Sequence, residues 1–529
     1  MRFPGWLTLV LVGACSSVNS PTGPGACNPT GGMDCANTIN AIVLPMLAHD
    51  GVHPQIAPDS ELCRRYSIDL TGVAPTWEEY QQNCAGRTPA QMVDYFMGQP
   101  GYVQINQRLW ADALQYDNRI VWYPYIQDLD AQVGKLYRGE LAYPDFAAIA
   151  VTHPGFIGKF VGENVVAYAF LAFLGRDALP EERQDLLGLY RMWKARPNYD
   201  PMLTRFRYNA CTTDADCATG RTCITMVCQS TTNYRELYID PRPCAGNLGE
   251  VFCSSPMHNV HVQLAGTQPM SLDQLAPSDW QVLQTPGRVL TTLPYFWEAA
   301  VDNVLHKYLG WWHGGVELPG YEIPEVRQAL ALFFQQKSGD MRALEREVLL
   351  SALYLMAAQE PQGDTKWWHY GPTKQMIAEV WLDSVAKFAG VGLGTCDWRF
   401  PNLTPRWLPP ALVPPRGPIA GFDYQHESRV MGGCPDQEAG FRYTDVGVLA
   451  EMEQRTILGT VCGFAGATAF LPAAGADKTK LIADLFRRAF TAAPGDEAAS
   501  LASGLPAADA STARNLCQAM LRSGRFLFY

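Results

Sequence analysis

The sequence predicts an all-α, multi-part protein with repeated helix–turn–helix units and one disulfide-rich, irregular insert. Three observations predict this fold class. Apolar residues recur at helical spacing from Ala36 to about Lys194, three separate segments share one helix–turn–helix pattern, and proline- and glycine-rich stretches separate the helical blocks. A chain of 529 residues, 47% of them hydrophobic, is also long enough to build more than one core.

The first element is a short apolar leader. Residues 1–15, MRFPGWLTLVLVGAC, carry one early positive charge and end in small residues before Cys15. This pattern is typical of a bacterial lipoprotein signal peptide, in which residues 1–14 are removed and Cys15 becomes the acylated N-terminus, with palmitate among its expected chains. An ordinary signal peptide and a buried first strand are the alternatives. Ser16 follows Cys15 in place of an acid, so we expect a lipid-anchored protein of the outer membrane, on its periplasmic or surface face.

The rest of the chain divides by composition. Residues 15–35 are rich in Ser, Pro, Gly and Asn, which predicts a flexible tether. After it we expect a helical domain at 36–204, a Cys-rich insert at 205–260, a second helical domain at 261–395, a Pro/Gly-rich connection at 396–442 and a C-terminal helical segment at 443–529. Within the first domain, Thr76 and Glu79 have the spacing of a capping box, which predicts a helix start at Thr76.

A weak internal repeat runs through the helical parts. Segments 67–79, 170–182 and 485–497 align without gaps when Gly72, Gly175 and Thr491 are matched, so these three residues should occupy equivalent turns. Closing helices with aromatic ends follow at 92–102, 346–354 and 517–526. The alternative is that any three amphipathic helix pairs look alike. The middle copy is split, because its opening helix ends near Lys194 and its closing helix comes at about residue 344.

The cysteines favour an oxidising compartment. Fourteen remain when Cys15 is set aside, and they fall into three groups of even size. We expect disulfides inside each group. The alternative is free buried thiols, and for the insert CTTDADCATGRTCITMVC it is zinc, although its Cys spacing is wider than that of a typical zinc site. The expected bridging residues are Cys27, Cys35, Cys63, Cys84, Cys211, Cys217, Cys223, Cys228, Cys244, Cys253, Cys396, Cys434, Cys462 and Cys517.

The stretch RRYSIDLTGVAPTWEE (64–79) carries a family resemblance. With residues 92–102 it resembles a domain of unknown function of planctomycete and other bacterial secreted proteins, often found beside c-type cytochrome domains. Residues 515–529 are similar to the closing helix of the domain that usually follows it, and the Cys-rich insert resembles modules of myxobacteria-like secreted proteins. The resemblance implies a helical envelope protein and brings no established activity. The family pattern maps onto Arg64, Arg65, Asp69, Leu70, Thr71, Gly72, Pro75, Thr76, Glu78 and Glu79.

The candidate ligand site is a repeated tripeptide. Trp-Trp-His occurs at 311–313 and at 367–369, and adjacent tryptophans on one helix cannot both face a single core. We therefore predict that one surface or cleft gathers all six side chains; the alternative is that the rings seal a domain junction and the histidines bond locally. The candidate site residues are Trp311, Trp312, His313, Trp367, Trp368 and His369.

Other polar groupings carry weaker signals. His49 and His53 have the spacing of a metal pair on a helix, but Gly51 and Pro54 argue against a helix there. His258 and His261 lie in a stretch that we expect to be a loop. Asp214 and Asp216 in the insert suit a turn or solvent better than calcium.

Composition and absent motifs limit the function. The net charge of −11 disfavours nucleic acid as a partner, and the lack of Cys-x-x-Cys-His means that the chain attaches no c-type haem, so no cofactor is expected. No nucleophile elbow, zinc-protease or phosphate-loop motif occurs in the sequence. We expect a binding or scaffolding component of the cell envelope that contacts other envelope proteins or polysaccharide. The alternatives are an exported enzyme or redox or metal accessory using the Trp/His cleft, and a carbohydrate-binding protein.

Overall fold

Helices make up the core of the protein and hold the repeat that the sequence predicts. A computed structural model describes residues 27, 33–114, 123–153, 156, 164–194, 213, 215, 222–224, 227–229, 235–240, 259–264, 284–310, 323–358, 366–393, 424–433, 451–452, 455–465, 470, 477–495 and 497–529. Among these residues the fold class is all-α apart from four short strands. None of the described helices is both long and apolar enough to cross a membrane.

Three groups of helices correspond to the predicted repeat, and we name them units 1, 2 and 3. Unit 1 comprises α2 (Asp59–Thr71), α3 (Trp77–Asn83), α4 (Pro89–Met97) and α5 (Pro100–Leu114). Unit 2 comprises α9 (Asn164–Leu174), α10 (Pro180–Lys194), α17 (Met341–Leu349) and α18 (Ala352–Leu355). Unit 3 comprises α24 (Lys478–Phe490), α25 (Glu497–Gly504), α26 (Ala510–Leu521) and α27 (Gly524–Leu527).

The matched turn residues share one backbone conformation. Gly72, Gly175 and Thr491 each end the first helix of their unit with a positive φ, at 74°, 62° and 55°. The left-handed region suits glycine and is strained for most other residues, so the turn explains why glycine occupies it twice. Thr491 adopts it despite its β-branched side chain. The predicted equivalence of these three positions is confirmed.

The closing helices of the units also match. In each unit a helix of nine to twelve residues ends, and a further helix starts three residues later with an aromatic at its third position. The amide of that aromatic donates to the carbonyl of the residue three before it in every unit. The three aromatics, all buried, are Tyr102, Tyr354 and Phe526.

The capping box at Thr76 is confirmed. Its Oγ1 accepts from the Glu79 amide at 3.1 Å, and the Glu79 carboxylate accepts from the Thr76 amide at 2.8 Å. We expect Thr76→Ala to lower the free energy of unfolding by about 1 kcal/mol, because the Glu79 amide at the start of α3 loses the Thr76 hydroxyl oxygen as its acceptor and the capping box is broken. Urea denaturation measures this loss. Thr76→Ser keeps the acceptor oxygen and should stay close to wild type; equal losses in both variants would show that the cap contributes nothing.

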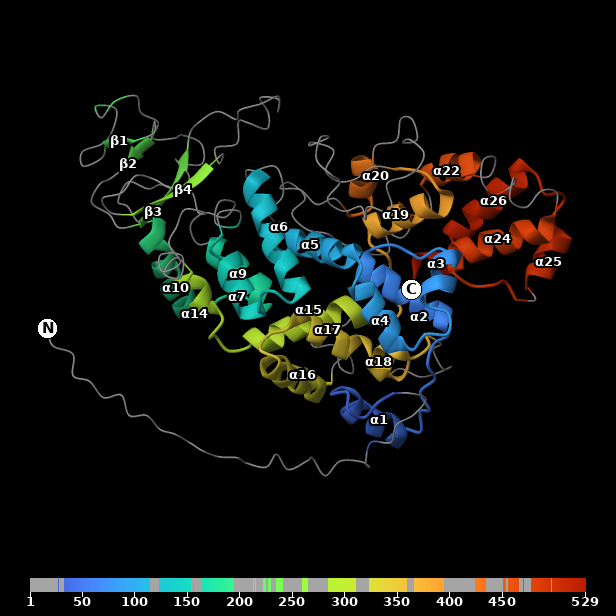
Figure 1. The fold of residues 1–529 in the computed structure, drawn as a ribbon, viewed down its shortest axis with the longest axis horizontal. Helices are drawn as coiled ribbons and strands as arrows, with labels where there is room; N and C mark the ends of the chain where they lie inside the picture. Colours follow the sequence, from blue (N-terminus) through green and yellow to red (C-terminus); the bar gives the residue numbers. More distant parts are fainter. Residues whose placement is uncertain are drawn as a thin grey trace.

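The remaining helices pack around the units in two hydrophobic clusters. The first cluster joins unit 1 to both sequence halves of unit 2, which flank the insert in the chain. The second cluster joins unit 3 to part of unit 1. Unit 1 lies between the other two in Figure 1. The first cluster includes α1 (Asn40–His49), α6 (Tyr123–Arg138), α7 (Tyr143–Ala150), α14 (Thr285–Leu290), α15 (Phe296–Leu309) and α16 (Pro324–Gln336), and the second includes α19 (Ala378–Ala389), α20 (Tyr424–Val430) and α22 (Ile457–Ala465).

Three disulfides follow the predicted local grouping. Cys27 bonds Cys35, Cys63 bonds Cys84, and Cys462 bonds Cys517. Met33 is buried in the first cluster, and Cys27 and Cys35 pack against that cluster. The remaining predicted bridging residues, apart from the backbone of Cys223 and Cys228, lie outside the described residues, as do Cys15 and the leader.

The insert holds regular structure that the sequence did not lead us to expect. Strand β1 (Thr222–Ile224) pairs antiparallel with β2 (Val227–Gln229), and Cys223 stands opposite Cys228 in that register. Strand β3 (Arg235–Asp240) pairs with β4 (Asn259–Leu264) across a long connection. The expected loop at His261 is therefore wrong, because backbone pairing with β3 places this residue in a strand. Helix α20 likewise lies inside the connection expected at 396–442.

Candidate functional site

The two adjacent arginines of the family pattern reach into different units. Both side chains are buried on α2. Arg64 donates to the carbonyls of Ala489 at 2.9 Å and Phe526 at 3.1 Å, both in unit 3. Arg65 donates to the carbonyls of Tyr354 at 3.0 Å and Met356 at 2.8 Å, at the end of unit 2. Consecutive positions on a helix point about 100° apart, so the two adjacent arginines can bond two different units.

Burial changes the acid–base properties of the first arginine. The guanidinium of Arg64 lies over the Phe526 ring at 5.3 Å, and burial, together with the nearby charge of Arg525, lowers the pKa of Arg64 to about 10. Arg65 instead forms an ion pair with Glu61 on its own helix. Arg64 therefore remains charged at neutral pH, and both arginines supply hydrogen-bond donors to neighbouring helix ends.

Asp69, the acid of the same pattern, collects three donors. Its Oδ2 accepts from the Tyr354 hydroxyl at 2.8 Å, and its Oδ1 accepts from the Tyr529 hydroxyl at 2.9 Å and from the Lys374 ammonium at 2.5 Å. Tyr354 belongs to unit 2, and Tyr529 follows unit 3. Asp69 is buried, so this one carboxylate joins all three units through desolvated, charge-assisted bonds.

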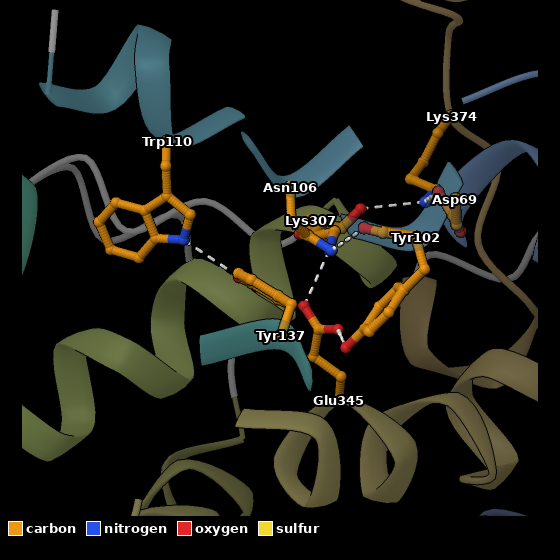
Figure 2. Close-up of polar contacts among 8 residues, drawn as sticks. All are labelled: Asp69, Tyr102, Asn106, Trp110, Tyr137, Lys307, Glu345 and Lys374. Carbon is orange, nitrogen blue, oxygen red and sulfur yellow. Dashed lines mark hydrogen bonds and ion pairs between the residues drawn. The ribbon is translucent and has the colours of Figure 1, made fainter. Parts of the chain in front are cut away.

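A second buried pair lies beside the first. Figure 2 shows the Lys307 ammonium between Glu345 Oε1, at 2.8 Å, and Asn106 Oδ1, at 2.6 Å. The Tyr102 hydroxyl donates to the other Glu345 oxygen at 2.6 Å. Lys374 joins the two groups, because its ammonium also donates to the Lys307 carbonyl at 3.0 Å. We call this set the inter-unit polar network; its members are Asp69, Tyr102, Asn106, Lys307, Glu345, Tyr354, Lys374 and Tyr529.

The network has little capacity for acid–base chemistry. Every carboxylate oxygen of Asp69 and Glu345 already accepts from a lysine or a tyrosine. Burial raises the pKa of Tyr102 and of Tyr354 well above the usual value, which keeps their hydroxyls protonated as donors. Burial lowers the pKa of Lys374, and the adjacent Asp69 opposes that shift. A general base needs a free acceptor facing its substrate, so this arrangement suits structural cohesion.

The predicted tryptophan–histidine site is described only in part. Residues 311–313 lie outside the described residues, and so does the side chain of Trp367. Trp368 and His369 are buried on the short 3₁₀ helix η3 (Trp367–His369). His369 Nε2 lies 3.0 Å from Asp50 Oδ2, at the end of α1. The two described side chains therefore contact the protein interior, and the common cleft of all six residues stays a prediction.

The other candidate histidines form no described metal centre. Helix α1 ends at His49, and Gly51 adopts a positive φ of 74°, so His49 and His53 do not share a helix face, as their flanking residues predict. His49, Lys366 and His369 all bond Asp50, and the bond from Lys366 is the main cause that lowers the pKa of that carboxyl to about 2. Among the residues that the structure describes, no three His, Cys, Asp or Glu side chains gather as metal ligands would.

A separate buried acid lies in the second cluster. Asp383 on α19 accepts from the Tyr424 hydroxyl at 2.9 Å and pairs with Arg108 of unit 1 at 3.4 Å. Burial outweighs these partners and raises the pKa of Asp383 from 3.8 to about 6. The protein interior therefore favours the protonated form of Asp383 near pH 5.

Asp383 should make the stability of the protein depend on pH. Its folded-state pKa is raised, so the folded state binds the proton more tightly, and the resulting stabilisation is complete below about pH 4 and is lost as the pH rises through 6. Relative to Asp383→Asn, the wild type should lose about 3 kcal/mol of unfolding free energy between pH 4 and pH 7. Urea denaturation of both proteins across this range measures the difference. A constant difference would show that Asp383 titrates normally.

The sequence did not single out the lysines and the glutamate of the network. Lys307 and Glu345 are 38 positions apart and Asp69 and Lys374 are 305 apart, so no local spacing joins them. One signal was present: Glu345 interrupts the apolar face of α17, where a buried charge requires a partner.

Comparisons with known proteins agree with the resemblance noted in the sequence. Residues 38–129 match the family model PSCyt2, described as a protein of unknown function (DUF1549). No curated protein and no solved structure matches the chain. The matched stretch contains α1, all of unit 1 and the start of α6, and therefore Arg64, Arg65 and Asp69. Residues 38–129 of this chain are thus a match to the PSCyt2 family of proteins of unknown function (DUF1549).

Proposed function

We propose that this chain is a lipid-anchored binding or scaffolding component of the bacterial cell envelope, without catalysis of its own. The observation that carries the proposal is the use of Arg64, Arg65 and Asp69, the charged residues at the start of the family pattern. All three are buried and bond neighbouring helix ends and tyrosines of the same chain. Charged side chains that all bond other parts of the same chain hold the helical units in a fixed arrangement. The polar residues of an active site, in contrast, keep some polar atoms free to contact a substrate.

The leader and the cysteines support the place in the cell. The small residues before Cys15 have the lipoprotein pattern, and three disulfides agree with an oxidising compartment. Acylation at Cys15 would hold the helical units at the membrane surface, where they meet other envelope proteins or polysaccharide.

Fractionation of the full chain tests the anchor. We expect wild-type protein to sediment with membranes and to need detergent for release, and Cys15→Ser to be soluble or unprocessed, because the acyl chains are the proposed attachment. Ser16→Ala, which keeps the cysteine, is the matched control and should behave as wild type. Membrane association of Cys15→Ser that only detergent reverses would contradict the lipoprotein proposal.

Affinity capture from a detergent-solubilised envelope tests the binding role. The mature chain should retain a defined protein or polysaccharide in a fixed ratio, and the destabilised Asp69→Ala variant should lose it above its own unfolding temperature. Failure of the folded chain to retain any envelope component would contradict the proposed function.

A further inference from the structure

A small hollow lies where units 1 and 3 meet helix α19. Its walls come from the unit 1 turn and α3, from α19, and from α24 and α27 of unit 3, and its empty volume out to the open mouth is about 340 Å³. Pro75 and the buried residues Phe388 and Phe526 supply the apolar part of the lining. No member of the inter-unit polar network lines the hollow, so it is a separate feature of the fold.

Two side chains of α19 bring hydrogen-bond donors to the hollow. Ser384 is 2% exposed, and its oxygen accepts from the Ala74 amide at 3.0 Å. No described residue accepts from its hydroxyl group, so this buried donor still lacks a partner. Lys387 donates to Glu79 at 2.6 Å, which uses one of the three N–H groups of its ammonium.

Arg488 of α24 adds a third donor group. Its Nε donates to Asp484 on the same helix at 2.8 Å, and its two terminal nitrogens have no acceptor among the residues that the structure describes. Glu78 is the one acid among the described lining residues, and it lies exposed in the first turn of α3. The buried part of the hollow therefore presents donors and apolar surface, which suits a ligand that accepts hydrogen bonds.

A buried positive charge without a counter-ion lies beside the hollow. Arg64 is 6% exposed and donates only to the backbone carbonyls of Ala489 and Phe526, and its Nε has no partner. No carboxylate of the described residues pairs with it. Its guanidinium lies 5.3 Å from the centre of the Phe526 ring, and Phe526 also lines the hollow. Since a buried charge is costly without compensation, an anion in the hollow would supply the missing opposite charge at short range.

We propose that this hollow binds a small monocarboxylate. The carboxylate oxygens accept from the terminal nitrogens of Arg488 and from the Ser384 hydroxyl, and a short apolar body contacts Phe388 and the other apolar lining residues. The apolar lining favours an organic acid over phosphate or sulfate, which have no apolar part to bury. The confined volume limits the body to a few carbon atoms.

This inference goes beyond the proposed scaffolding function and does not depend on it. A ligand seated in the hollow contacts the unit 1 turn, α19 and unit 3 together. Because it binds the folded junction, it should stabilise the attachment of unit 3 to the rest of the protein.

Equilibrium dialysis of the full chain bearing Cys15→Ser against radiolabelled propionate tests the inference. We expect saturable binding at one site, and Arg488→Gln should weaken it by about tenfold or more, because a charged hydrogen bond to the carboxylate is lost. Arg487→Gln is the matched control: it removes the same charge from the neighbouring position of α24, outside the hollow, and should bind as the parent does.

Thermal unfolding supplies a second readout that does not rely on the dialysis. Saturating propionate should raise the unfolding temperature of the parent and of Arg487→Gln, and should leave that of Arg488→Gln nearly unchanged. Propionamide has the same shape without the charge and should have no effect on any of the three. Trialanine with a free carboxyl group separates two sources of a carboxylate: its exclusion assigns the site to a free acid, and its binding assigns the site to a peptide end as well.

Three outcomes would overturn the inference. Absence of saturable propionate binding excludes the site, equal binding of propionamide excludes recognition of the charge, and equal losses in Arg487→Gln and Arg488→Gln exclude the hollow. Retention of an envelope component by a chain that binds no propionate would keep the proposed function and reject the carboxylate site alone, so the two proposals fail separately.

Discussion

Replacing Asp69 with alanine should lower the free energy of unfolding by about 3–5 kcal/mol, the usual cost of removing one member of a buried ion pair. The substitution leaves the buried Lys374 ammonium without its carboxylate and removes the acceptor of the Tyr354 and Tyr529 hydroxyls. Polar groups left buried without partners carry their full desolvation cost. The loss should affect all three units, because the three donors come from different parts of the chain.

Equilibrium denaturation in urea measures this loss, with Asp94→Ala as the control. Asp94 also joins units 1 and 2, through Arg346 on α17, but that pair is exposed to solvent. An exposed pair contributes at most about 1 kcal/mol. Similar small losses for both variants would show that the inter-unit polar network does not hold the units together.

Removing the Cys462–Cys517 bridge by a double alanine substitution should lower the free energy of unfolding by about 4 kcal/mol on the chain-entropy model. The bridge joins α22 to α26 and closes a loop of 55 residues, so its absence enlarges the unfolded ensemble considerably. Both cysteines are fully buried, and alanine is chosen because it places no polar group in the core.

The Cys27–Cys35 bridge supplies the comparison. Its sequence separation is only 8, so the same model gives about 2.5 kcal/mol for the corresponding double alanine variant. Guanidinium denaturation of both variants under oxidising conditions measures the two losses. A larger loss at Cys27–Cys35 would contradict the entropic explanation and indicate that packing around that bridge dominates.

The repeat could be predicted from the sequence because its signals are local. A left-handed turn favours glycine, a capping box has fixed spacing, and an aromatic closes each unit, so Gly72, Thr76 and Tyr102 mark unit 1 without knowledge of the fold. Thr491 was placed by alignment alone, and the structure gives it the same conformation.

The inter-unit polar network could not be predicted because its partners are far apart in sequence. Nothing local indicates that Arg64 meets the carbonyl of Phe526 or that Lys374 meets Asp69. The strand at His261 was missed for the same reason, since β4 is defined by pairing with β3 across a long connection. Tertiary contacts decide such elements, and local periodicity carries no trace of them.

The double arginine and the aspartate give the family pattern a physical meaning. Arg64 and Arg65 are adjacent in sequence but bond units 3 and 2, and Asp69 bonds side chains from both directions. A homologous domain that keeps these three residues should therefore be joined to helical neighbours that present carbonyls and tyrosine hydroxyls at equivalent positions. This expectation concerns architecture and does not require a shared activity.

Hydrogen–deuterium exchange of Arg64→Gln and Arg65→Gln tests most directly whether the pattern joins the units. Exchange reports the local opening of each helix. Arg64→Gln should speed exchange in α24 and α27 while sparing α18, and Arg65→Gln should speed exchange in α18 and residues 354–356 while sparing unit 3, because each guanidinium bonds a different neighbour. Identical exchange patterns in the two variants, or changes confined to α2, would contradict the account.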